Sequence, residues 1–502
     1  MKPRILLGWS SALCLSAMPL LGQETNQVEQ LKKELQEMQQ NFERIQREQR
    51  QQMEALHQQI ETLEKQQSSA AAEQAKLKNL VEARSAAPPA AETAPKPWSP
   101  SDPIRLLGGP HSYLNLSFDA LFAAGGSTAN DIERGLQLGG HDPVQRGFTV
   151  QNLETTFEGM VDPYFRGQAN IILQIDREGE SFLEVEEAYL ETLSLPGRLQ
   201  LKAGQYFTEF GRLNQFHPHV WDFVDQPLVN GRFLGGDGLR NAGARLSWLA
   251  PTPFYSELFL SAQNSQGETA ASFRNGNEGE PLFGRLMDQG SVQSLGDMLF
   301  VPRYAASFNL SESQTLLAGV SAAFGPNGSG PDTDTQLYGL DLFWKWKPVN
   351  HNKGFPFVSW QSEAMLRRYE AGAFDWDRNG DGNLDPDEQD ADGNGTPDLL
   401  ARETLSDWGF YSQLLWGIRP RWVAGLRGDY VAGSQAGYEE LLGDDLQRGR
   451  RWRLSPNFTW FPTEFSKLRL QYNHDDRKSI GVDHSVWLQF EFLLGSHGAH
   501  KF

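Results

Sequence analysis

The sequence predicts an all-β fold class: a transmembrane antiparallel β-barrel of about sixteen strands, preceded by an α-helical coiled coil. Three observations favour this prediction. Strand-length segments after residue 112 alternate between apolar and polar side chains, the connections between them alternate between short and long, and a heptad pattern precedes them. No segment beyond the N-terminus supplies about 18 consecutive apolar residues, which excludes a helical membrane span.

The N-terminal residues 1–22 are predicted to be a signal peptide. Lys2 and Arg4 precede a short apolar stretch that ends at Leu21, the pattern of a secretory signal rather than of a membrane anchor. The single cysteine, Cys14, lies inside this segment, so we expect the exported chain to have no disulfide bonds. The formal net charge of −19 argues against nucleic acid as a partner.

Residues 23–84 are predicted to form a coiled coil. Apolar residues repeat there at alternating steps of three and four, at Val28, Leu31, Leu35, Met38, Phe42 and Ile45. The register shifts by four residues between Gln49 and Met53, a stutter that loosens the supercoil without ending it. A lone solvated helix is the alternative. Residues 85–112 are rich in Pro and Ala and are predicted to be a semi-rigid linker.

From residue 113 to 502 the hydrophobic period is two. In the segment 164–176, Ile171 and Leu173 share one face while Asn170 and Gln174 share the other, which indicates a different solvent on each side of the sheet. Tyr338 lies near one end of another such segment and Trp344 near its other end, as in the aromatic girdles of membrane barrels. The predicted strands are 113–123, 148–160, 164–176, 182–193, 198–207, 240–249, 254–263, 302–310, 315–324, 336–346, 356–368, 407–417, 421–432, 451–461, 466–475 and 485–494.

The connections between these segments fall into two classes. The even-numbered ones are mostly short, such as 161–163 and 250–253, with 347–355 as the exception. Most odd-numbered ones are long and polar: 124–147, 208–239, 264–301 and 369–406. Short turns on one side and long loops on the other are typical of a bacterial outer-membrane barrel. We therefore expect the short turns and the coiled coil to lie in the periplasm and the long loops to lie outside the cell.

Residues 201–249, "LKAGQYFTEFGRLNQFHPHVWDFVDQPLVNGRFLGGDGLRNAGARLSWL", resemble the phosphate-selective porin O/P type of outer-membrane porin. The likeness rests on a strand that ends in Gly-Gln, a Phe-Gly after it, a long third loop and an Arg- and Gly-rich return into the next strand. It covers roughly residues 113–502 and, loosely, the coiled-coil prefix. The resemblance implies a trimeric channel for passive diffusion, whose third loop folds into the pore.

The third loop departs from that family in its charges. Anion selectivity in the family is associated with basic residues at the constriction, whereas residues 208–239 contain no lysine. We expect the constriction to involve Glu209, Arg212, Asp222, Asp225, Arg232, Asp237 and Arg240, with Phe210 and His217 in or beside the loop. Because charges at a constriction set ion preference, phosphate specificity is not carried over to this chain.

The loop 375–398 contains "DRNGDGNLDPDE", a calcium-loop pattern. Calcium prefers six to eight hard oxygen ligands, and a glycine allows the sharp turn at position 6, which is Gly382 here. The predicted ligands are Asp377, Asn379, Asp381, Asn383, Asp385 and Glu388, followed by a second, shorter array of Asp390, Asp392, Asn394 and Asp398. The alternative is an acidic solvated loop. A bound Ca²⁺ here would be structural.

Other chemistry is poorly supported by the sequence. His217 and His219, and His497 and His500 in the tail, lack cysteines or a convincing third ligand nearby for a metal site. No nucleophile motif or phosphate-binding loop occurs in a suitable context, so no enzyme activity is expected. We expect a porin that passes small hydrophilic or ionic solutes, with outer-membrane lipid as its surroundings, a homotrimer as its assembly and peptidoglycan as a further candidate partner of the coiled coil. The alternatives are a tethering or adhesion protein with a coiled-coil stalk, and a substrate-specific outer-membrane receptor.

Overall fold

The computed structural model describes residues 102–108, 112–130, 132–160, 162–175, 179–275, 281–288, 290–386 and 388–495. The chain divides into two compact units, Met1–Pro97 and Trp98–Phe502. The predicted signal peptide (1–22) and coiled coil (23–84) lie outside the described residues, as do His497 and His500. Within the described ranges, no helix has both the length and the apolar character needed to cross a membrane.

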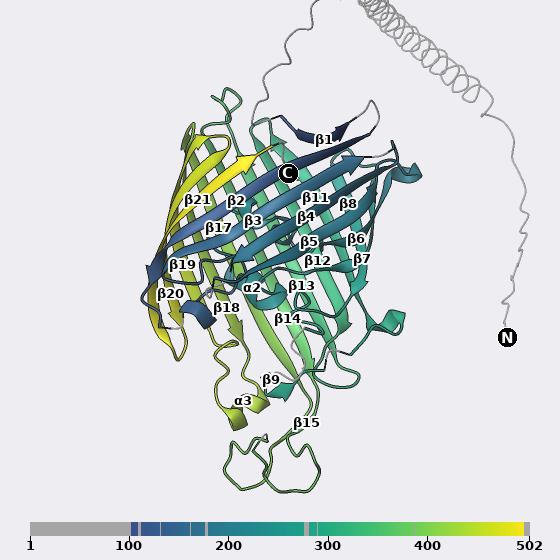
Figure 1. Ribbon diagram of the computed structural model, residues 1–502, viewed down its shortest axis with the longest axis vertical. Helices are drawn as coiled ribbons and strands as arrows, with labels where there is room; N and C mark the ends of the chain where they lie inside the picture. The colour runs from purple at the N-terminus through teal and green to yellow at the C-terminus, as the bar shows by residue number, and fades with distance from the viewer. Residues whose placement is uncertain are drawn as a thin grey trace, which may run out of the picture. The chain divides into compact units, whose positions relative to one another are not determined.

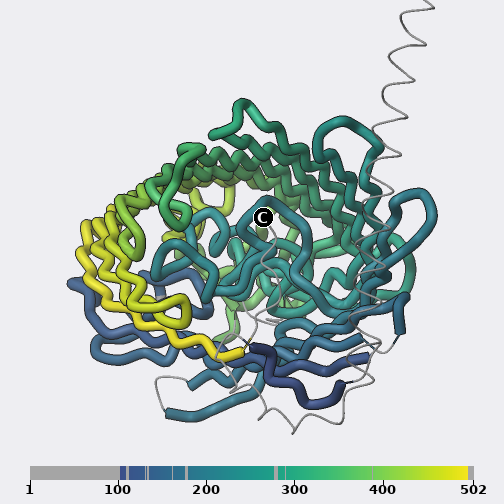
Figure 2. Tube along the Cα trace, turned by 90° about the horizontal axis from the view of Figure 1, so that it is seen from above, coloured from purple at the N-terminus to yellow at the C-terminus, as the bar shows by residue number. Residues whose placement is uncertain are grey.

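The second unit is a closed antiparallel β-barrel, shown from the side in Figure 1 and from above in Figure 2. Sixteen strands pair in chain order, and the last pairs with the first through Phe118 and Leu494. These strands are β2 (Tyr113–Ser127), β3 (Gly147–Met160), β4 (Phe165–Ile175), β5 (Ser181–Thr192), β6 (Leu199–Phe207), β7 (Arg240–Leu249), β8 (Tyr255–Asn264), β11 (Met298–Ser311), β12 (Gln314–Pro326), β13 (Asp334–Trp346), β14 (Phe357–Ala371), β17 (Glu403–Arg419), β18 (Trp422–Gly433), β19 (Arg451–Thr463), β20 (Ser466–Arg477) and β21 (Gly481–Leu494). The predicted barrel and its strand number are confirmed.

One further strand, β1 (Ile104–Gly108), lies inside the segment predicted as a linker. It pairs antiparallel with the start of β2, placing Ile104 opposite Leu116 and Gly108 opposite Tyr113. The neighbouring strand β21 pairs with β2 only from Phe118 onward. β1 therefore pairs with the start of β2, where β21 does not reach and the edge of β2 would otherwise be unpaired.

The barrel wall buries polar side chains and exposes apolar ones. Along β21, Ser485, Gln489 and Glu491 face inward and are buried, while Leu488 and Phe490 face outward and are 48% and 40% exposed. β14, β17, β19 and β20 show the same alternation. A water-soluble protein has the reverse arrangement, so this pattern places an apolar solvent around the barrel.

Aromatic residues mark two levels on the outer wall. Trp344 lies opposite Trp360 near the short turns, and Trp422 lies opposite Trp460 at the same end. Near the long loops, Tyr430 lies opposite Trp452. Eight residues separate Trp408 from Trp416 on β17, or roughly 27 Å along the strand at ~3.4 Å per residue. With a strand tilt of about 35–45°, this spacing projects to roughly 20 Å along the barrel axis, which spans most of the apolar band of about 25 Å in membrane barrels.

Several strands extend further toward the long loops than the sequence predicted. β14 continues to Ala371, and β17 begins at Glu403. The sequence prediction relied on the alternation of apolar and polar side chains, which weakens beyond the aromatic level near the long loops. Backbone hydrogen bonds between strands do not depend on this alternation, so the strands continue past that level.

The long connection 208–239 folds back into the barrel, where Figure 1 shows α2 among the strands. It contains η3 (Leu213–Gln215), η4 (Pro218–Val220) and α2 (Leu228–Leu234). Its apolar side chains pack on inward-facing apolar residues of the wall, such as Leu337, Met365 and Val431. The barrel interior is thus not uniformly polar, because this loop brings its own apolar core.

Smaller elements complete the long-loop end of the barrel: η1 (Ile132–Leu136), β9 (Pro281–Leu282), β10 (Arg285–Leu286), η5 (Leu295–Asp297), β15 (Phe374–Asp375), β16 (Leu399–Leu400) and α3 (Gly437–Leu442). At the opposite end, η2 (Pro196–Arg198) forms the turn between β5 and β6. Phe283, Tyr369, Leu400 and Tyr438 form one apolar cluster under the loops. β15 and β16 pair through Phe374 and Leu400 and close the base of the loop 375–398.

Candidate functional site

The loop 208–239 is fixed to the wall at its start by Glu363 of β14. The buried Glu363 carboxylate accepts hydrogen bonds from the backbone nitrogens of Arg212 (3.1 Å) and Leu213 (2.7 Å), and Gly211 N donates to Ser321 Oγ at 3.0 Å. Gly211 adopts φ +62°, and a Cβ there would collide with Glu363 Oε2. Only glycine can adopt this positive φ readily and also leave space for the Glu363 carboxylate.

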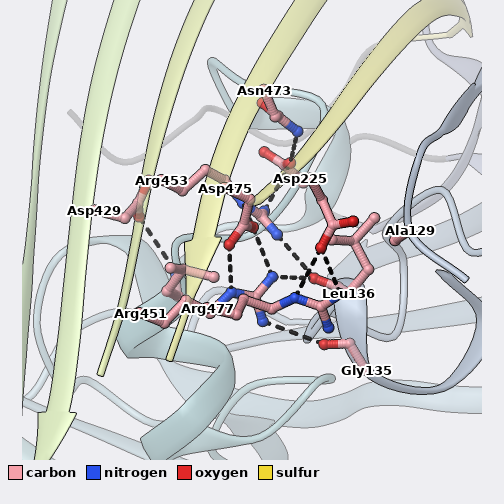
Figure 3. Close-up of polar contacts among 12 residues, drawn as sticks. Ala129, Gly135, Leu136, Asp225, Asp429, Arg451, Arg453, Asn473, Asp475 and Arg477 are labelled. Carbon is pink, nitrogen blue, oxygen red and sulfur yellow. Dashed lines mark hydrogen bonds and ion pairs between the residues drawn. The ribbon is translucent and has the colours of Figure 1, made fainter. Parts of the chain in front are cut away.

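The middle of the loop is held by an arginine of β18 and one of β19, of which Figure 3 labels Arg453 of β19. Asp225 accepts from Arg427 Nη2 at 2.6 Å and from Arg453 Nη1 at 2.9 Å, with Gln471 and Asn473 donating at 2.8 Å and 2.7 Å. Burial raises the pKa of Asp225, but the charges of Arg427 and Arg453 outweigh it and hold the pKa below its ordinary value. Asp225 is therefore a fully compensated buried charge.

The same arginine group also holds the first long loop. Arg453 Nη2 donates to the carbonyl of Leu136 at 2.8 Å, and Arg451 Nη1 donates to that of Gly135 at 3.2 Å. Asp475 of β20 binds both guanidinium groups, with 2.7 Å to Arg453 Nε and 2.8 Å to Arg451 Nε. One cluster of wall charges thus positions two loops that are distant in sequence.

At the wall formed by β3 and β5, the loop brings His217 and His219 against buried carboxylates. His217 Nδ1 lies 3.3 Å from Glu154 Oε2 and 2.6 Å from Glu186 Oε2, and His217 Nε2 lies 2.9 Å from Glu187 Oε2. His219 Nδ1 lies 3.2 Å from the same Glu154 oxygen. Burial lowers the pKa of His217, but Glu154 and Glu186 outweigh it and hold the pKa well above its ordinary value.

A β-bulge in β5 provides two of these carboxylates. Asn170 pairs with Glu187 and Ile171 with Val185, so Glu186 is the extra residue. Both Glu186 and Glu187 are consequently buried on the inner side. Sequence analysis missed Glu154, Glu186 and Glu187. The adjacent glutamates in "LEVEEAYLE" interrupt the alternation of period two, and this interruption was the sequence feature that could have indicated the bulge.

The predicted constriction residues occupy different environments. Glu209 is buried and accepts from Arg245 Nη1 at 2.7 Å, and Arg240, also buried, pairs with Glu184 of β5. Arg232 donates to the backbone carbonyls of Arg448 (3.2 Å) and Gly449 (3.1 Å). Asp237 lies near His141, with 3.8 Å between the carboxylate and Nε2. The loop 208–239 packs on residues of the inner wall, and both the constriction and the effect of these charges on ion preference stay predictions.

Arg212 and Asp222 keep partial exposure inside the barrel. The Arg212 guanidinium lies 4.1 Å from the Phe343 ring centroid and donates from Nε to Gln361 at 3.2 Å. Asp222 accepts from Gln413 Nε2 at 3.0 Å. Burial raises the pKa of Asp222, while Arg469 and Lys467 of β20 lower it less strongly.

The first predicted calcium array folds around Asp377. Its carboxylate accepts from the backbone nitrogens of Gly380 (2.7 Å), Asp381 (3.1 Å) and Gly382 (2.9 Å). Glu388 reaches back to accept from Arg378 N at 2.9 Å and Asp385 N at 3.0 Å. Both carboxylates thus bind backbone nitrogens of the loop, and their role as calcium ligands stays a prediction.

The second array has a similar turn around Asp390. Asn394 N and Gly395 N donate to its two oxygens at 3.0 Å and 2.9 Å. Carboxylate oxygens of Asp390, Asp392 and Asp398 lie within 4.8 Å of one another. Ala391 N donates to Asp398 at 2.8 Å, and Asp398 itself is buried.

Comparison with known proteins identifies a relative but not an activity. No family model matches the chain. An uncharacterized protein of Aquifex aeolicus (strain VF5) is 32% identical over 388 residues, covering 72% of this chain and 73% of the relative. The chain belongs to the same family as this Aquifex protein. The resemblance to the phosphate-selective porin type stays a prediction.

Among solved structures, several outer-membrane proteins are similar at low identity. The outer membrane channel DcaP of Acinetobacter baumannii is 13% identical with a TM-score of 0.48, covering 76% of this chain and 98% of that one. OprB of Pseudomonas putida is 9% identical with a TM-score of 0.44, covering 76% and 94%. An anion-selective porin from Comamonas acidovorans is 6% identical with a TM-score of 0.42, covering 76% and 100%.

Proposed function

We propose that residues 113–502 form an outer-membrane channel through which small hydrophilic or ionic solutes diffuse passively. The single observation that carries this proposal is the inverted wall: buried polar residues inside the barrel and exposed apolar residues outside it. The two aromatic levels on the outer wall support the same conclusion, since such girdles mark membrane interfaces. The long loops then face the cell exterior and the short turns the periplasm.

The loop 208–239 would narrow this channel. Its attachments to β12, β14, β18 and β19 cross the barrel interior. Of the predicted constriction charges, Glu209, Asp225 and Arg240 are buried in ion pairs, whereas Arg212, Asp222, Arg232 and Asp237 keep partial exposure. The partly exposed set holds two charges of each sign, so we expect weak ion preference rather than strong anion selectivity.

Conductance across a planar lipid bilayer tests the channel. Purified full-length protein should give discrete conductance steps, and reversal potentials in a salt gradient should show weak selectivity. Arg212→Ala should shift the reversal potential in the direction of greater cation selectivity. Arg402→Ala, which removes an exposed arginine of an outer loop, should leave it unchanged. An absence of steps from correctly folded protein would favour the tethering alternative, and strong anion selectivity would contradict the charge argument.

We also propose that the loop 375–398 binds calcium as a structural ion. The supporting observations are the carboxylate turn around Asp377 and the grouping of Asp390, Asp392 and Asp398. Carboxylate and amide oxygens are the ligands that Ca²⁺ prefers, and extracellular sites with affinities of about 10⁻⁴–10⁻³ M are filled outside the cell. Limited proteolysis with and without Ca²⁺ tests this, and equal cleavage in both conditions would leave only an acidic loop.

The assembly we propose is a homotrimer, surrounded by outer-membrane lipid and tethered in the periplasm by the coiled coil, with peptidoglycan as its candidate partner there. Support comes from the heptad seam of residues 23–84, which favours association without setting its number. The mass of the detergent-solubilised protein, corrected for bound detergent, tests the proposal: a monomer at micromolar concentration would contradict it.

A further inference from the structure

A buried group of histidines and carboxylates lies where the loop 208–239 meets the β3–β5 wall. His217 and His219 come from the loop, His141 comes from the connection between β2 and β3, Glu154 lies in β3, and Glu186 and Glu187 lie in β5. All six side chains are buried. Neither the proposed channel nor the calcium loop uses this group.

Three donor atoms of this group converge. Oxygens of Glu154 and Glu186 and a nitrogen of His217 lie within 4.8 Å of one another. For metal–ligand bonds of about 2.0–2.2 Å, tetrahedral neighbours are separated by about 3.3 Å. The distance of 3.3 Å from His217 Nδ1 to Glu154 Oε2 matches this spacing. Glu186 Oε2, at 2.6 Å from Nδ1, would withdraw by less than about 1 Å.

The surrounding hydrogen bonds orient these donors. His217 Nε2 lies 2.9 Å from Glu187 Oε2, and a carboxylate at one imidazole nitrogen fixes the tautomer that presents the other to a metal ion. Thr156 Oγ1 donates to Glu154 Oε1 at 3.0 Å, which leaves Glu154 Oε2 facing the histidines.

Several buried polar atoms in the group face only one another. Glu186 Oε2 lies 2.6 Å from His217 Nδ1 and Glu186 Oε1 lies 3.6 Å from His141 Nε2, and among the described residues neither oxygen has a partner outside the group. Buried carboxylates require partners of opposite charge, which here are histidines alone. A cation held between these atoms would satisfy them together.

We propose that His217, Glu154 and Glu186 bind a divalent transition-metal ion such as Zn²⁺. The mixed nitrogen and oxygen donor set suits Zn²⁺, Mn²⁺ or Fe²⁺ rather than Ca²⁺, which takes oxygen donors, or Cu(I), which takes sulfur donors. Such an ion would join the loop 208–239 to the β3–β5 wall, in addition to its attachment to Arg427 and Arg453. Three carboxylates at the site supply the charge that a divalent ion requires.

Metal binding to the tag-free, full-length protein tests this proposal. Co²⁺ is the probe, added with excess Ca²⁺ so that the loop 375–398 does not compete for it. We expect about one Co²⁺ per chain, with the visible absorption of a tetrahedral site, and displacement by Zn²⁺. His217→Gln and Glu186→Gln should each weaken binding at least ten-fold.

Two controls make the test decisive. The double variant His497→Gln, His500→Gln removes tail histidines and should leave binding unchanged. Glu186→Gln keeps the side-chain shape, and a heat-modifiable shift on a denaturing gel will show whether its barrel is folded. The proposal would be overturned if the unaltered protein bound no Co²⁺, or if the folded Glu186→Gln variant bound Co²⁺ as tightly as the unaltered protein. It would also be overturned if only the tail variant lost Co²⁺ binding.

Discussion

At the residue scale, the buried charge of Asp225 is compensated by four side chains of the barrel wall. Asp225, buried in the middle of the loop 208–239, contacts Arg427, Arg453, Gln471 and Asn473. A buried charge of this kind contributes little net free energy while it is intact, but removing one member leaves the others unpaired. The loop position therefore depends on the pairing more than on any single contact.

Asp225→Asn should destabilise the folded protein by about 3 kcal/mol, because Arg427 and Arg453 would lose the carboxylate between them. Urea unfolding in lipid vesicles, followed by tryptophan fluorescence, measures the change. Asp237→Asn is the matched control. Its side chain is partly exposed and 3.8 Å from His141, so we expect a change of roughly 0.5 kcal/mol or less. Equal effects of the two substitutions would contradict the argument.

At the element scale, the barrel strands and the loop 375–398 are stabilised by different interactions. The strands are held by sixteen pairings in a closed ring, whereas the loop 375–398 is closed by two pairs between β15 and β16 and by carboxylate turns. Asp377, Asp381 and Asp385 all belong to its first array, where Asp381 N donates to Asp377 and Asn379 Nδ2 donates to Asp385. Without a cation these carboxylates repel one another.

Replacing Asp377 and Glu388 by Ala should make residues 375–398 easy to cleave even with millimolar Ca²⁺, since the two anchoring carboxylates are lost. Barrel assembly and conductance should stay nearly unchanged. Protease digestion followed by mass spectrometry locates the cuts. Replacing Glu440 by Ala, an acidic residue of α3, is the control and should keep the calcium protection. Unchanged protection in the double variant would sink the proposed ligand assignment.

A peptide of residues 24–84 should be helical and associate at micromolar concentration, most simply as a trimer that matches a trimeric barrel. The apolar seam from Val28 to Ile45 is the physical reason. Circular dichroism and analytical ultracentrifugation measure helicity and mass. Replacing Leu35 and Phe42 by Gln should abolish association, while the same change at the non-seam residues Lys33 and Glu37 should not. A peptide that stays monomeric and unfolded counts against the prediction.

At the scale of the whole molecule, the barrel separates two solvents. Its interior carries paired charges and an apolar loop core, and its exterior carries a band of aliphatic and aromatic side chains between two aromatic levels. The apolar band on the outside is an unfavourable surface in water. The barrel is consequently stable as described only within a membrane or detergent.

Leu488→Lys should reduce insertion into lipid vesicles, because a lysine near the middle of the outer band costs about 2–4 kcal/mol in the bilayer. Ile480→Lys is the control, since Ile480 is similarly exposed but lies in the turn between β20 and β21, outside the band. The fraction of heat-modifiable protein after refolding measures insertion. Equal insertion of both variants would place the membrane elsewhere on the barrel.

The sequence by itself determined the strand number, the sorting of turns and loops and the calcium-loop pattern. Each of these depends on contrast or spacing between residues near one another in the chain, such as Ile171 against Asn170, or Asp377 against Glu388. A membrane barrel pairs its strands in chain order, so local periodicity is sufficient to predict the ring.

Only the tertiary structure decided which charges inside the barrel meet. Asp225 pairs with Arg453, 228 residues away, and His217 meets Glu154 of β3 and Glu186 of β5. The bulge that turns Glu186 inward, and the apolar core under the loop 208–239, also escaped prediction. Periodicity shows which face of a strand a side chain occupies. Which wall residues a loop contacts inside the barrel depends on how the strands are arranged in the closed ring, and local periodicity does not contain that information.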